Sequence, residues 1–274
     1  MVGRGVDQND IKAIRDLQII SALRGVDSTG YAVGLSTSEK YHDLIKYSGD
    51  PISFNWTTSN QEDYVIDSIH NDYWIGHTRS GTRGTRSSNG AQPFRIKHIT
   101  GVHNGTIEGD IRGYYSDSEL LLSSIAMNGP KPTLSALTEK DSAALIWFDR
   151  EKKRLFFYRN QLRPLTFAVH KKKDVIYWAS EQLALDLALT RNHIRDVDYW
   201  YFTPYVLYSC DPSRVRKDEK FAFGRQEIKP KWLLEKEAKK AEEDKLKELQ
   251  TKTIQVEANQ LEQQSLPFSM SPDV

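Results

Sequence analysis

Two charged positions in the sequence have the chemistry needed to bind a group of opposite charge, one a carboxylate and the other an ammonium. Arg79 lies in Gly76-His-Thr-Arg-Ser-Gly-Thr-Arg-Gly84, directly after an apolar stretch. A guanidinium at a strand end can hold a carboxylate through two parallel hydrogen bonds. Asp117 lies in Ser116-Asp-Ser-Glu119, where a capping box accounts for the flanking Ser and Glu at a helix start. The carboxylate of Asp117 is then left to bind an ammonium group.

A neutral pair of donors follows in Val102-His-Asn-Gly-Thr-Ile-Glu108. The side-chain amide of Asn104 and the backbone NH of Gly105 are suited to an oxyanion hole, which stabilises the oxygen of a carbonyl under attack. Asn-Gly between apolar strands is also the strongest short signal for a type I′ hairpin turn, so a plain turn is an alternative here.

A further polar segment, Arg24-Gly-Val-Asp-Ser-Thr-Gly-Tyr-Ala32, joins a predicted helix to a predicted strand. Its Gly and Asp-Ser residues fit a helix C-terminus and a turn, but that interpretation leaves Arg24 and Asp27 unexplained. A rival interpretation of the Arg79 segment is a basic loop, with Arg83 and Arg86, for phosphate or single-stranded nucleic acid. No wider basic surface supports it, since 38 Lys and Arg residues balance 37 Asp and Glu residues in a chain of net charge +1.

Composition bears on three further questions: disulfide bonds, metal sites and membrane segments. The chain has 274 residues and a single cysteine, Cys210, which excludes an internal disulfide and a multi-thiolate metal site. No apolar segment suggests a secretory signal or a membrane span, so we expect a cytoplasmic protein without a membrane partner. His70, His77, His98 and His103 lack a ligand spacing such as His-Glu-x-x-His, so we expect no metal ion and no cofactor.

Periodicity predicts an α+β layered sandwich in residues 1–229. Composition then changes: 230–264 reads as a charged helical extension, and 265–274 as a disordered Ser/Pro-containing tail. The expected helices are Asp10–Leu23, Gln61–His70, Ser116–Met127 and Glu181–Thr190. The expected strands are Gly30–Ser36, Tyr73–Thr78, Phe94–Ile99, Gly101–Ile107, Ala143–Phe148, Arg154–Tyr158, Leu165–Val169, Val175–Ala179 and Tyr199–Tyr208.

The order of these segments resembles the glutaminase domain of class II glutamine amidotransferases, whose pattern is closest in glucosamine-6-phosphate synthase. The four motifs are Arg-Gly-x-Asp-Ser-x-Gly, Gly-His-Thr-Arg-x-x-Thr-x-Gly, His-Asn-Gly-x-Ile-Glu and Ser-Asp-x-Glu. Asn89-Gly-Ala-Gln-Pro-Phe94 and Tyr177-Trp-Ala-Ser-Glu-Gln-Leu-Ala184 extend the resemblance, which covers about two thirds of the chain. It implies the four-layer αββα sandwich of N-terminal-nucleophile hydrolases.

The resemblance also implies roles for individual residues. Glutamine would be the substrate, with Arg79 on its α-carboxylate and Asp117 on its α-amino group. Asn104 and Gly105 would form the oxyanion hole, Thr82 would contact the substrate, and Arg24 would support the nucleophile's end of the site. Two departures stand beside these matches, because the family's aromatic residue after His-Thr-Arg is Ser80 here, and a common later His is Arg83.

The nucleophile is the larger departure. The family uses an N-terminal cysteine whose own α-amino group is the general base, whereas this sequence starts Met1-Val2-Gly3. Cys210 follows the matching motifs and is expected to be a buried structural residue. Two accounts stand: a start that omits most of the family's first strand, which we favour, or a non-catalytic glutamine- or glutamate-binding pseudo-enzyme or scaffold. In the first, ammonia passes to a separate synthase subunit.

Overall fold

The computed structural model describes residues 1–38, 43–54, 69–81, 84, 88–215 and 223–264, with side chains given as far as 255. The described strands form two antiparallel sheets. The first, sheet A, has the order β11 (Val197–Tyr201), β9 (Thr166–His170), β10 (Val175–Ala179), β1 (Val2–Gly3), β4 (Tyr73–Arg79), β2 (Ser28–Gly34) and β3 (Asp43–Tyr47). The second, sheet B, has the order β13 (Gly224–Glu227), β12 (Val206–Cys210), β8 (Arg154–Arg159), β7 (Ser142–Asp149), β6 (Ile99–Thr106) and β5 (Phe94–Ile96).

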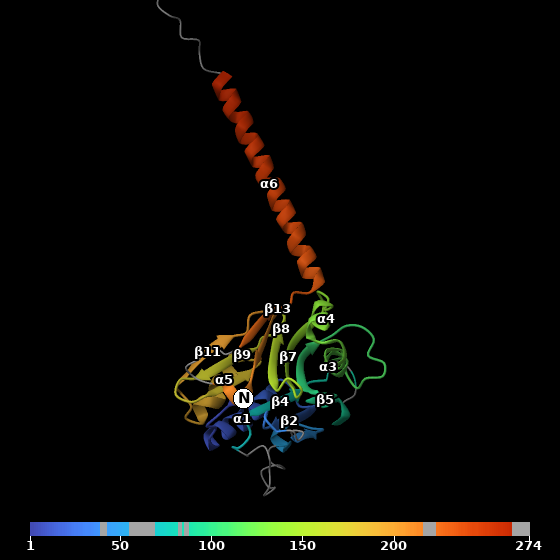
Figure 1. Ribbon diagram of the computed structural model, residues 1–274, viewed down its shortest axis with the longest axis vertical. Coiled ribbons are helices and arrows are strands. Elements are labelled where there is room, and N and C mark those ends of the chain that lie inside the picture. Colours follow the sequence, from blue (N-terminus) through green and yellow to red (C-terminus); the bar gives the residue numbers. More distant parts are fainter. Residues whose placement is uncertain (39–42, 55–68, 82–83, 85–87, 216–222, 265–274) are drawn as a thin grey trace, which may run out of the picture. The chain divides into compact units, whose positions relative to one another are not determined.

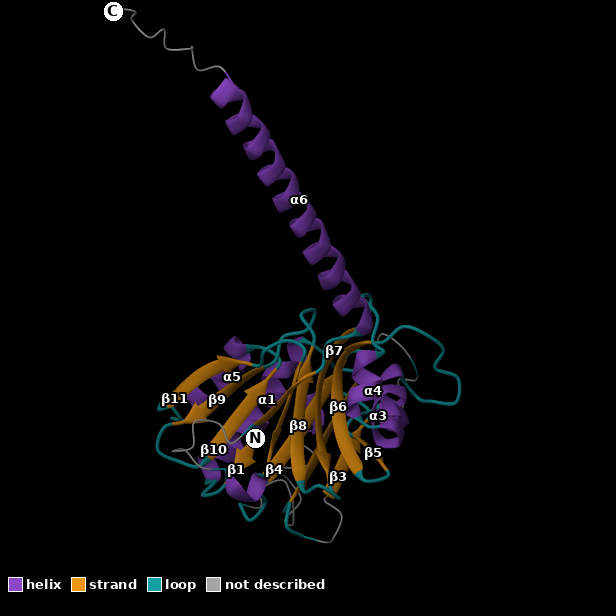
Figure 2. Cartoon of the chain, turned by 45° about the horizontal axis from the view of Figure 1, so that its top comes forward, coloured by secondary structure: helices purple, strands orange, loops and turns teal. Residues whose placement is uncertain are grey.

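Helices cover the outer faces of both sheets, as Figure 2 shows. Helices α1 (Gln8–Ile20) and α5 (Gln182–Arg191) contact each other and pack on sheet A. Helices α3 (Asp117–Asn128) and α4 (Pro130–Ser135) lie beside β6 and β5 of sheet B. The four layers, helix, sheet, sheet and helix, confirm the expected αββα sandwich.

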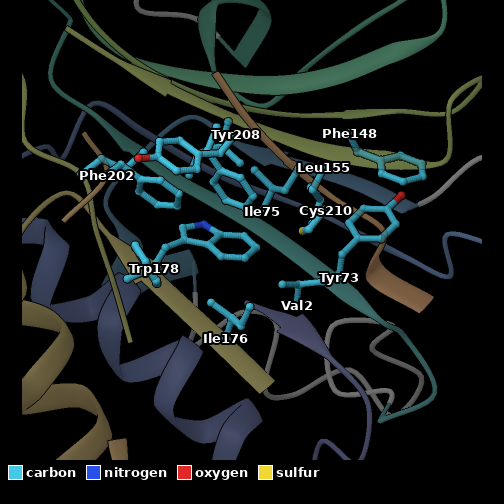
Figure 3. Close-up of a cluster of buried hydrophobic side chains, with 14 of the residues drawn as sticks. Val2, Tyr73, Ile75, Phe148, Leu155, Ile176, Trp178, Phe202, Tyr208 and Cys210 are labelled. Carbon is cyan, nitrogen blue, oxygen red and sulfur yellow. The ribbon is translucent and has the colours of Figure 1, made fainter. Parts of the chain in front are cut away.

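The main core fills the space between the two sheets (Figure 3). Its side chains come from alternate positions of facing strands, as the two-residue period of a strand requires. Aromatic rings dominate it: Tyr73 stacks on Phe148 with ring centroids 4.4 Å apart, and Phe157 stacks on Phe202 at 5.0 Å. This apolar layer holds the inner strands β4 and β6 at a fixed separation, and both of them carry candidate site residues.

Helix α1 is fixed to sheet A by a buried polar contact as well as by its apolar face. Asp7 caps the helix, and Asp10 completes a capping box with it. Asp10 is fully buried and accepts hydrogen bonds from the Tyr177 hydroxyl at 2.5 Å and the Lys173 ammonium at 3.0 Å. The helix therefore starts at Gln8, two residues before the predicted start, and it is tied to β10.

The predicted single strand Tyr199–Tyr208 is wrong. The chain forms β11 in sheet A, leaves it at Phe202, and enters sheet B as β12 at Val206. Tyr205 has a positive φ of 62°, which a continuous strand does not allow. Aromatic and β-branched residues run through both strands, so their propensity gave no signal of the break.

The elements β3, β13 and α4 are among those not predicted from the sequence. The first two are sheet-edge strands of mostly polar or mixed composition, and α4 has only six residues. The predicted helix Gln61–His70 falls almost entirely outside the described residues.

Residues 231–274 form a separate compact unit from residues 1–230. Its described part is one continuous helix, α6 (Lys231–Gln264), shown in Figure 1. Leu234, Leu246, Leu249 and Ile254 are each at least half exposed on it. The predicted tail 265–274 lies outside the described residues. Within the part of the chain that is described, no helix has the length and apolar character needed to cross a membrane.

Candidate functional site

One cavity of about 310 Å³ brings together five of the six residues selected from the sequence. Arg24, Arg79, Asn104, Gly105 and Asp117 all line it. The sixth, Thr82, lies outside the described residues. The cavity is contributed by both sheets and by α1, α3 and α5, so segments far apart in the sequence meet at it.

Arg79 is the last residue of β4, and its side chain is only 5% exposed. The segment that begins at Arg24 holds it in place. Asp27 donates its backbone NH to the Arg79 carbonyl at 2.9 Å, and its carboxylate accepts the Gly81 NH at 2.6 Å. Gly25 passes so close that a Cβ there would overlap the Arg79 carbonyl. The glycine and aspartate of this motif therefore have a specific task, which is to fix the turn after Arg79.

Arg24 itself connects two walls of the cavity. Its Nη1 donates to the Ser180 hydroxyl at 3.0 Å and to the Glu181 carboxylate at 2.6 Å, at the start of α5. The side chains of this ion pair are 34% and 50% exposed, so its contribution to stability is small. Its structural effect is to join the turn after α1 to the turn after β10.

Asp117 is the first residue of α3 and is 3% exposed. One carboxylate oxygen accepts the Ile107 NH at 2.8 Å, which leaves the other oxygen for a ligand. The position at a helix N-terminus favours the negative charge. Ser116 caps the helix as predicted, but Glu119 accepts the NH of Tyr115 and not that of Ser116, so the predicted capping box is only half formed.

Asn104 and Gly105 lie within strand β6, and the alternative of a hairpin turn is wrong. They pair with Ala144 and Ala143 of β7. A Cβ on Gly105 would overlap the carbonyl oxygen of Ser142, so only glycine fits the position. The turn between β5 and β6 instead lies at Lys97, which has a φ of 52°. The Asn-Gly pair is thus presented to the cavity by a paired strand.

A buried hydrogen-bond network lies behind Asn104 and Gly105 and was not predicted from the sequence. Gln92 clamps the backbone of His103: its Oε1 accepts the His103 NH at 2.7 Å, and its Nε2 donates to the His103 carbonyl at 3.0 Å. The His103 ring contacts the Ser118 hydroxyl through Nδ1 at 3.0 Å and the Ser142 carbonyl through Nε2 at 3.2 Å. A carbonyl can only accept, so the proton belongs on Nε2 of a neutral ring.

Burial keeps this histidine neutral. It lowers the pKa of His103, although nearby Asp117 acts in the opposite direction. The network therefore joins the residue before Asn104 to the residue after Asp117 without a charge. The sequence carried one signal for it, since Gln92 precedes Pro93 where the resembling family shows histidine.

His77 and Gln18 present polar atoms without partners among the described residues. Nδ1 of His77 and Oε1 of Gln18 are buried and unpaired, and both residues line the cavity. Burial, helped by His103 and Arg79, lowers the pKa of His77 to about 3. Buried polar atoms normally have partners, so these two mark a place where a further hydrogen-bonding group fits.

Next to His77 and Gln18, an open slot runs between β4 and β10 through the centre of sheet A. Strand β1 pairs with β10 through Val2 and Ile176 and with β4 through Val2 and Tyr73. The Met1 amine donates to the Trp74 carbonyl at 2.9 Å, and Met1 lines the cavity. Beyond it, β4 and β10 continue on the two sides of the slot, each still paired with its outer neighbour. The cavity is lined there by Gly76, His77, Thr78, Trp178, Ala179 and Ser180.

Apolar side chains wall the slot on both faces of the sheet. Ile14, Leu17, Leu185 and Leu189 come from the helices, and Val102, Ala144, Ile146 and Leu165 come from sheet B and the start of β9. One strand with alternating side chains would bury them on both sides. Burial also lowers the pKa of the Met1 amine well below its usual value.

Cys210 lies outside this cavity, in the core between the sheets (Figure 3). It is 3% exposed, and burial raises the pKa of its thiol to about 12. A thiol of this kind is not a nucleophile at neutral pH, which confirms the prediction of a structural role. Within the described residues, no group of three or more His, Cys, Asp or Glu side chains is placed to hold a metal ion.

Solved structures with the same arrangement come from glutamine amidotransferases. Glutamine phosphoribosylpyrophosphate amidotransferase from B. subtilis, in complex with ADP and GMP, matches with a TM-score of 0.56 and 18% identity. The match covers 81% of this chain and 46% of that one. This is the N-terminal-nucleophile hydrolase fold. A structure described as the allosteric regulatory enzyme of purine biosynthesis matches with the same TM-score, identity and coverage.

This chain and the two solved structures thus share the N-terminal-nucleophile hydrolase fold at low sequence identity. No family model matches the chain, and no curated protein sequence matches it either. The chain spans about half the length of these two neighbours, at 46% of each. Their shared part is the amidotransferase-like fold that carries the cavity.

Proposed function

We propose that this chain is a glutamine amidotransferase domain that hydrolyses glutamine to glutamate and releases ammonia. The observation that carries the proposal is the convergence of Arg79, Asp117, Asn104 and Gly105 on one cavity. A cation, an anion and two neutral donors in one enclosed space match the carboxylate, ammonium and side-chain amide of free glutamine. The glutamine amidotransferase-like fold gives independent support.

Each contact has a defined role in this proposal. Arg79 holds the α-carboxylate in a bidentate pair, and the free oxygen of Asp117 holds the α-ammonium. These two charges fix the amino acid so that its side-chain carbonyl oxygen meets the amide of Asn104 and the NH of Gly105. Because β6 fixes both donors before the ligand arrives, they stabilise the oxyanion without reorganisation.

We infer that the nucleophile belongs to residues preceding Met1, which would continue β1 through the slot. Strand β1 is antiparallel to both neighbours, so added residues enter between β4 and β10. Counting back along the Val2–Tyr73 register, the residue opposite Gly76 stands two positions before Met1. A segment of about five residues at 3.3 Å per residue reaches the level of Arg79. The unpaired His77 and Gln18 atoms support this occupant.

The proposed reaction then follows the chemistry of an N-terminal cysteine. The α-amino group takes the thiol proton, and the sulfur attacks the side-chain carbonyl carbon of glutamine. The carbon–nitrogen bond breaks, the nitrogen leaves as ammonia with the transferred proton, and a thioester remains. Water then cleaves the thioester, which gives glutamate and restores the thiol.

A second candidate is a non-catalytic protein that binds glutamine or glutamate on the same fold. It is favoured by the position of Cys210, the chain's one cysteine, outside the cavity. Under this proposal the residues that grip the amino acid work as a receptor. Both candidates predict amino-acid binding, and only the first predicts turnover.

We further propose that the ammonia acceptor is a separate synthase subunit. The charged helix Lys231–Gln264 is the candidate docking element for that subunit. In this proposal residues 1–229 are the amidotransferase domain, 230–264 are a helical extension that docks the partner, and 265–274 are a tail.

The decisive experiment begins with the nucleotides upstream of the Met1 codon. An in-frame segment starting with cysteine is added to the chain, and glutamate release from glutamine is measured. Asp117→Ala and replacement of the added cysteine by alanine are the controls, and both are expected to abolish release. Glutamine binding without turnover in the extended chain would favour the pseudo-enzyme, and absence of both would refute the glutamine site.

A further inference from the structure

A third arginine, Arg163, lines the cavity as Arg24 and Arg79 do. It lies in the loop between β8 and β9, outside the motifs selected from the sequence. The loop is firmly held: Asn160 accepts the NH groups of Ala143 at 3.2 Å and Leu162 at 3.1 Å, and Arg159 donates to the Arg163 carbonyl at 3.0 Å. Pro164 restricts the backbone of Arg163 to an extended conformation. The guanidinium is therefore presented by a fixed backbone.

The guanidinium is anchored next to the oxyanion donors. Its Nε donates to the Ser142 hydroxyl at 3.2 Å, and the same oxygen accepts the Thr106 NH at 3.0 Å. The carbonyl of Ser142 is the group that packs directly against Gly105. Arg163 thus lies at the end of the cavity where the side-chain carbonyl of a bound amino acid would sit.

Among the described residues, the Arg163 side chain makes no ion pair, and its one hydrogen bond is the one to the Ser142 hydroxyl. Arg24, by contrast, pairs with Glu181. Among the described residues lining the cavity, three are arginines and Asp117 alone is acidic. Because Asp117 opens α3, where the α-ammonium is expected, the other end of the cavity has the Arg163 guanidinium and no acidic lining residue among those described.

We propose that Arg163 is a specificity-determining residue that favours negative charge on the side chain of the bound amino acid. This inference rests on the proposed function and refines it. L-glutamate, whose side chain is a carboxylate, is bound more tightly than L-glutamine, which carries charge there only while its amide is under attack. The cation thus makes the site retain its acidic product, and it defines the ligand class as acidic L-amino acids and their amides.

The test is calorimetric titration of the present chain with L-glutamate and L-glutamine at low and high salt. Arg163→Gln is expected to weaken glutamate binding about tenfold while glutamine binding changes less than about twofold. Arg163→Lys keeps the charge and is expected to restore most of the glutamate affinity. Arg195→Gln, an exposed arginine away from the cavity, removes the same charge and is expected to change neither affinity.

The outcomes separate this inference from the function on which it rests. Binding of both ligands with an unchanged glutamate-to-glutamine ratio in Arg163→Gln overturns the role of Arg163 and leaves the proposed function standing. An equal loss for both ligands, with a lower melting temperature, also overturns it, because that result means a structural role. Failure of both the present chain and the extended chain to bind either ligand overturns the proposed function and this inference together.

Discussion

The centres of the two sheets differ in how completely their strands are paired. In sheet B, β6 and β7 pair along eight residues from Ile99 to Thr106, and β8 continues the ladder on the other side of β7. In sheet A, the central strand β1 has two residues, and β4 and β10 extend past it along an open slot. Asn104 and Gly105, the proposed oxyanion donors, are in the first region, and the slot is in the second.

The hydrogen bonds that position Gly105 are complete in this chain, whereas those beside the slot would, in our proposal, come from a further segment. Gly105 is held by a complete ladder and by the clamp of Gln92 on His103, so its position does not depend on an occupant of the slot. The wall formed by His77 and Gln18 retains unpaired polar atoms. The site therefore combines a half whose hydrogen bonds are complete with a half that, in our proposal, a further strand completes.

The largest expected contrast is between two truncations of aliphatic side chains. Leu155 is fully buried in the core between the sheets, so Leu155→Ala is expected to cost about 3 kcal/mol of unfolding free energy. Ile14 already borders the cavity, so Ile14→Ala is expected to cost only about 1 kcal/mol because less packing is lost. Urea unfolding measures both, and equal costs would contradict an open slot.

The two hydrogen bonds between the Gln92 side chain and the His103 backbone can be removed by a separate substitution. Gln92→Met leaves the NH and carbonyl of His103 without their side-chain partners, which is expected to cost about 2 kcal/mol of unfolding free energy. Amino-acid affinity should fall as well, since the donors next to His103 lose their support. Gln161→Met, at an exposed position, is the control, and a similar loss in both variants would argue against the clamp.

His77, which borders the slot, should make the largest contribution to the loss of stability at low pH. His77 has a folded-state pKa of about 3, far below 6.5, so the unfolded state binds a proton that the folded state excludes between these values. Stability is therefore complete above pH 6.5 and falls as the pH drops, by up to about 1.4 kcal/mol per unit.

His77→Asn is expected to flatten this slope, and thermal melts between pH 4 and 7 measure it. His103, whose pKa burial also lowers, leaves part of the slope in the variant. The exposed His193→Asn should retain the wild-type profile. A slope that is the same in His77→Asn and wild type would show that His77 is not held neutral.

The smallest expected effect concerns the helix that presents Asp117. Ser116→Ala removes the cap on the Glu119 NH and is expected to cost about 1 kcal/mol. Ser116→Asp keeps an acceptor at the cap and should recover most of the stability in the same melting experiment. If amino-acid binding falls in Ser116→Ala while Ser116→Asp restores it, the cap also helps to position Asp117.

Residues at the ends of regular elements could be predicted from the sequence. Arg79 ends a hydrophobic strand and Asp117 begins a capped helix, so local patterns placed both of them. Most of the helices and strands that form the four layers also follow from periodicity. Convergence of Arg79 and Asp117 on one cavity was an expectation of the resemblance, and it required the fold to be tested.

The remainder depended on contacts between remote segments. Gln92 holds the backbone of His103, and Ser142 anchors the side chain of Arg163, and neither pair has a local sequence pattern. The exchange between sheets after Phe202 was missed for a related reason, since apolar character is uninterrupted around a turn made at Tyr205. Such features are decided by packing across the molecule and not by local propensity.

The hydrogen bond between the Met1 amine and the Trp74 carbonyl has a practical meaning for handling the protein. Because β1 points from Val2 toward the cavity in the reverse direction of the chain, an affinity tag fused before Met1 would be fed between β4 and β10. Such a tag would compete with ligands for the cavity and lower the measured affinities. A tag attached at the other end of the chain does not extend β1.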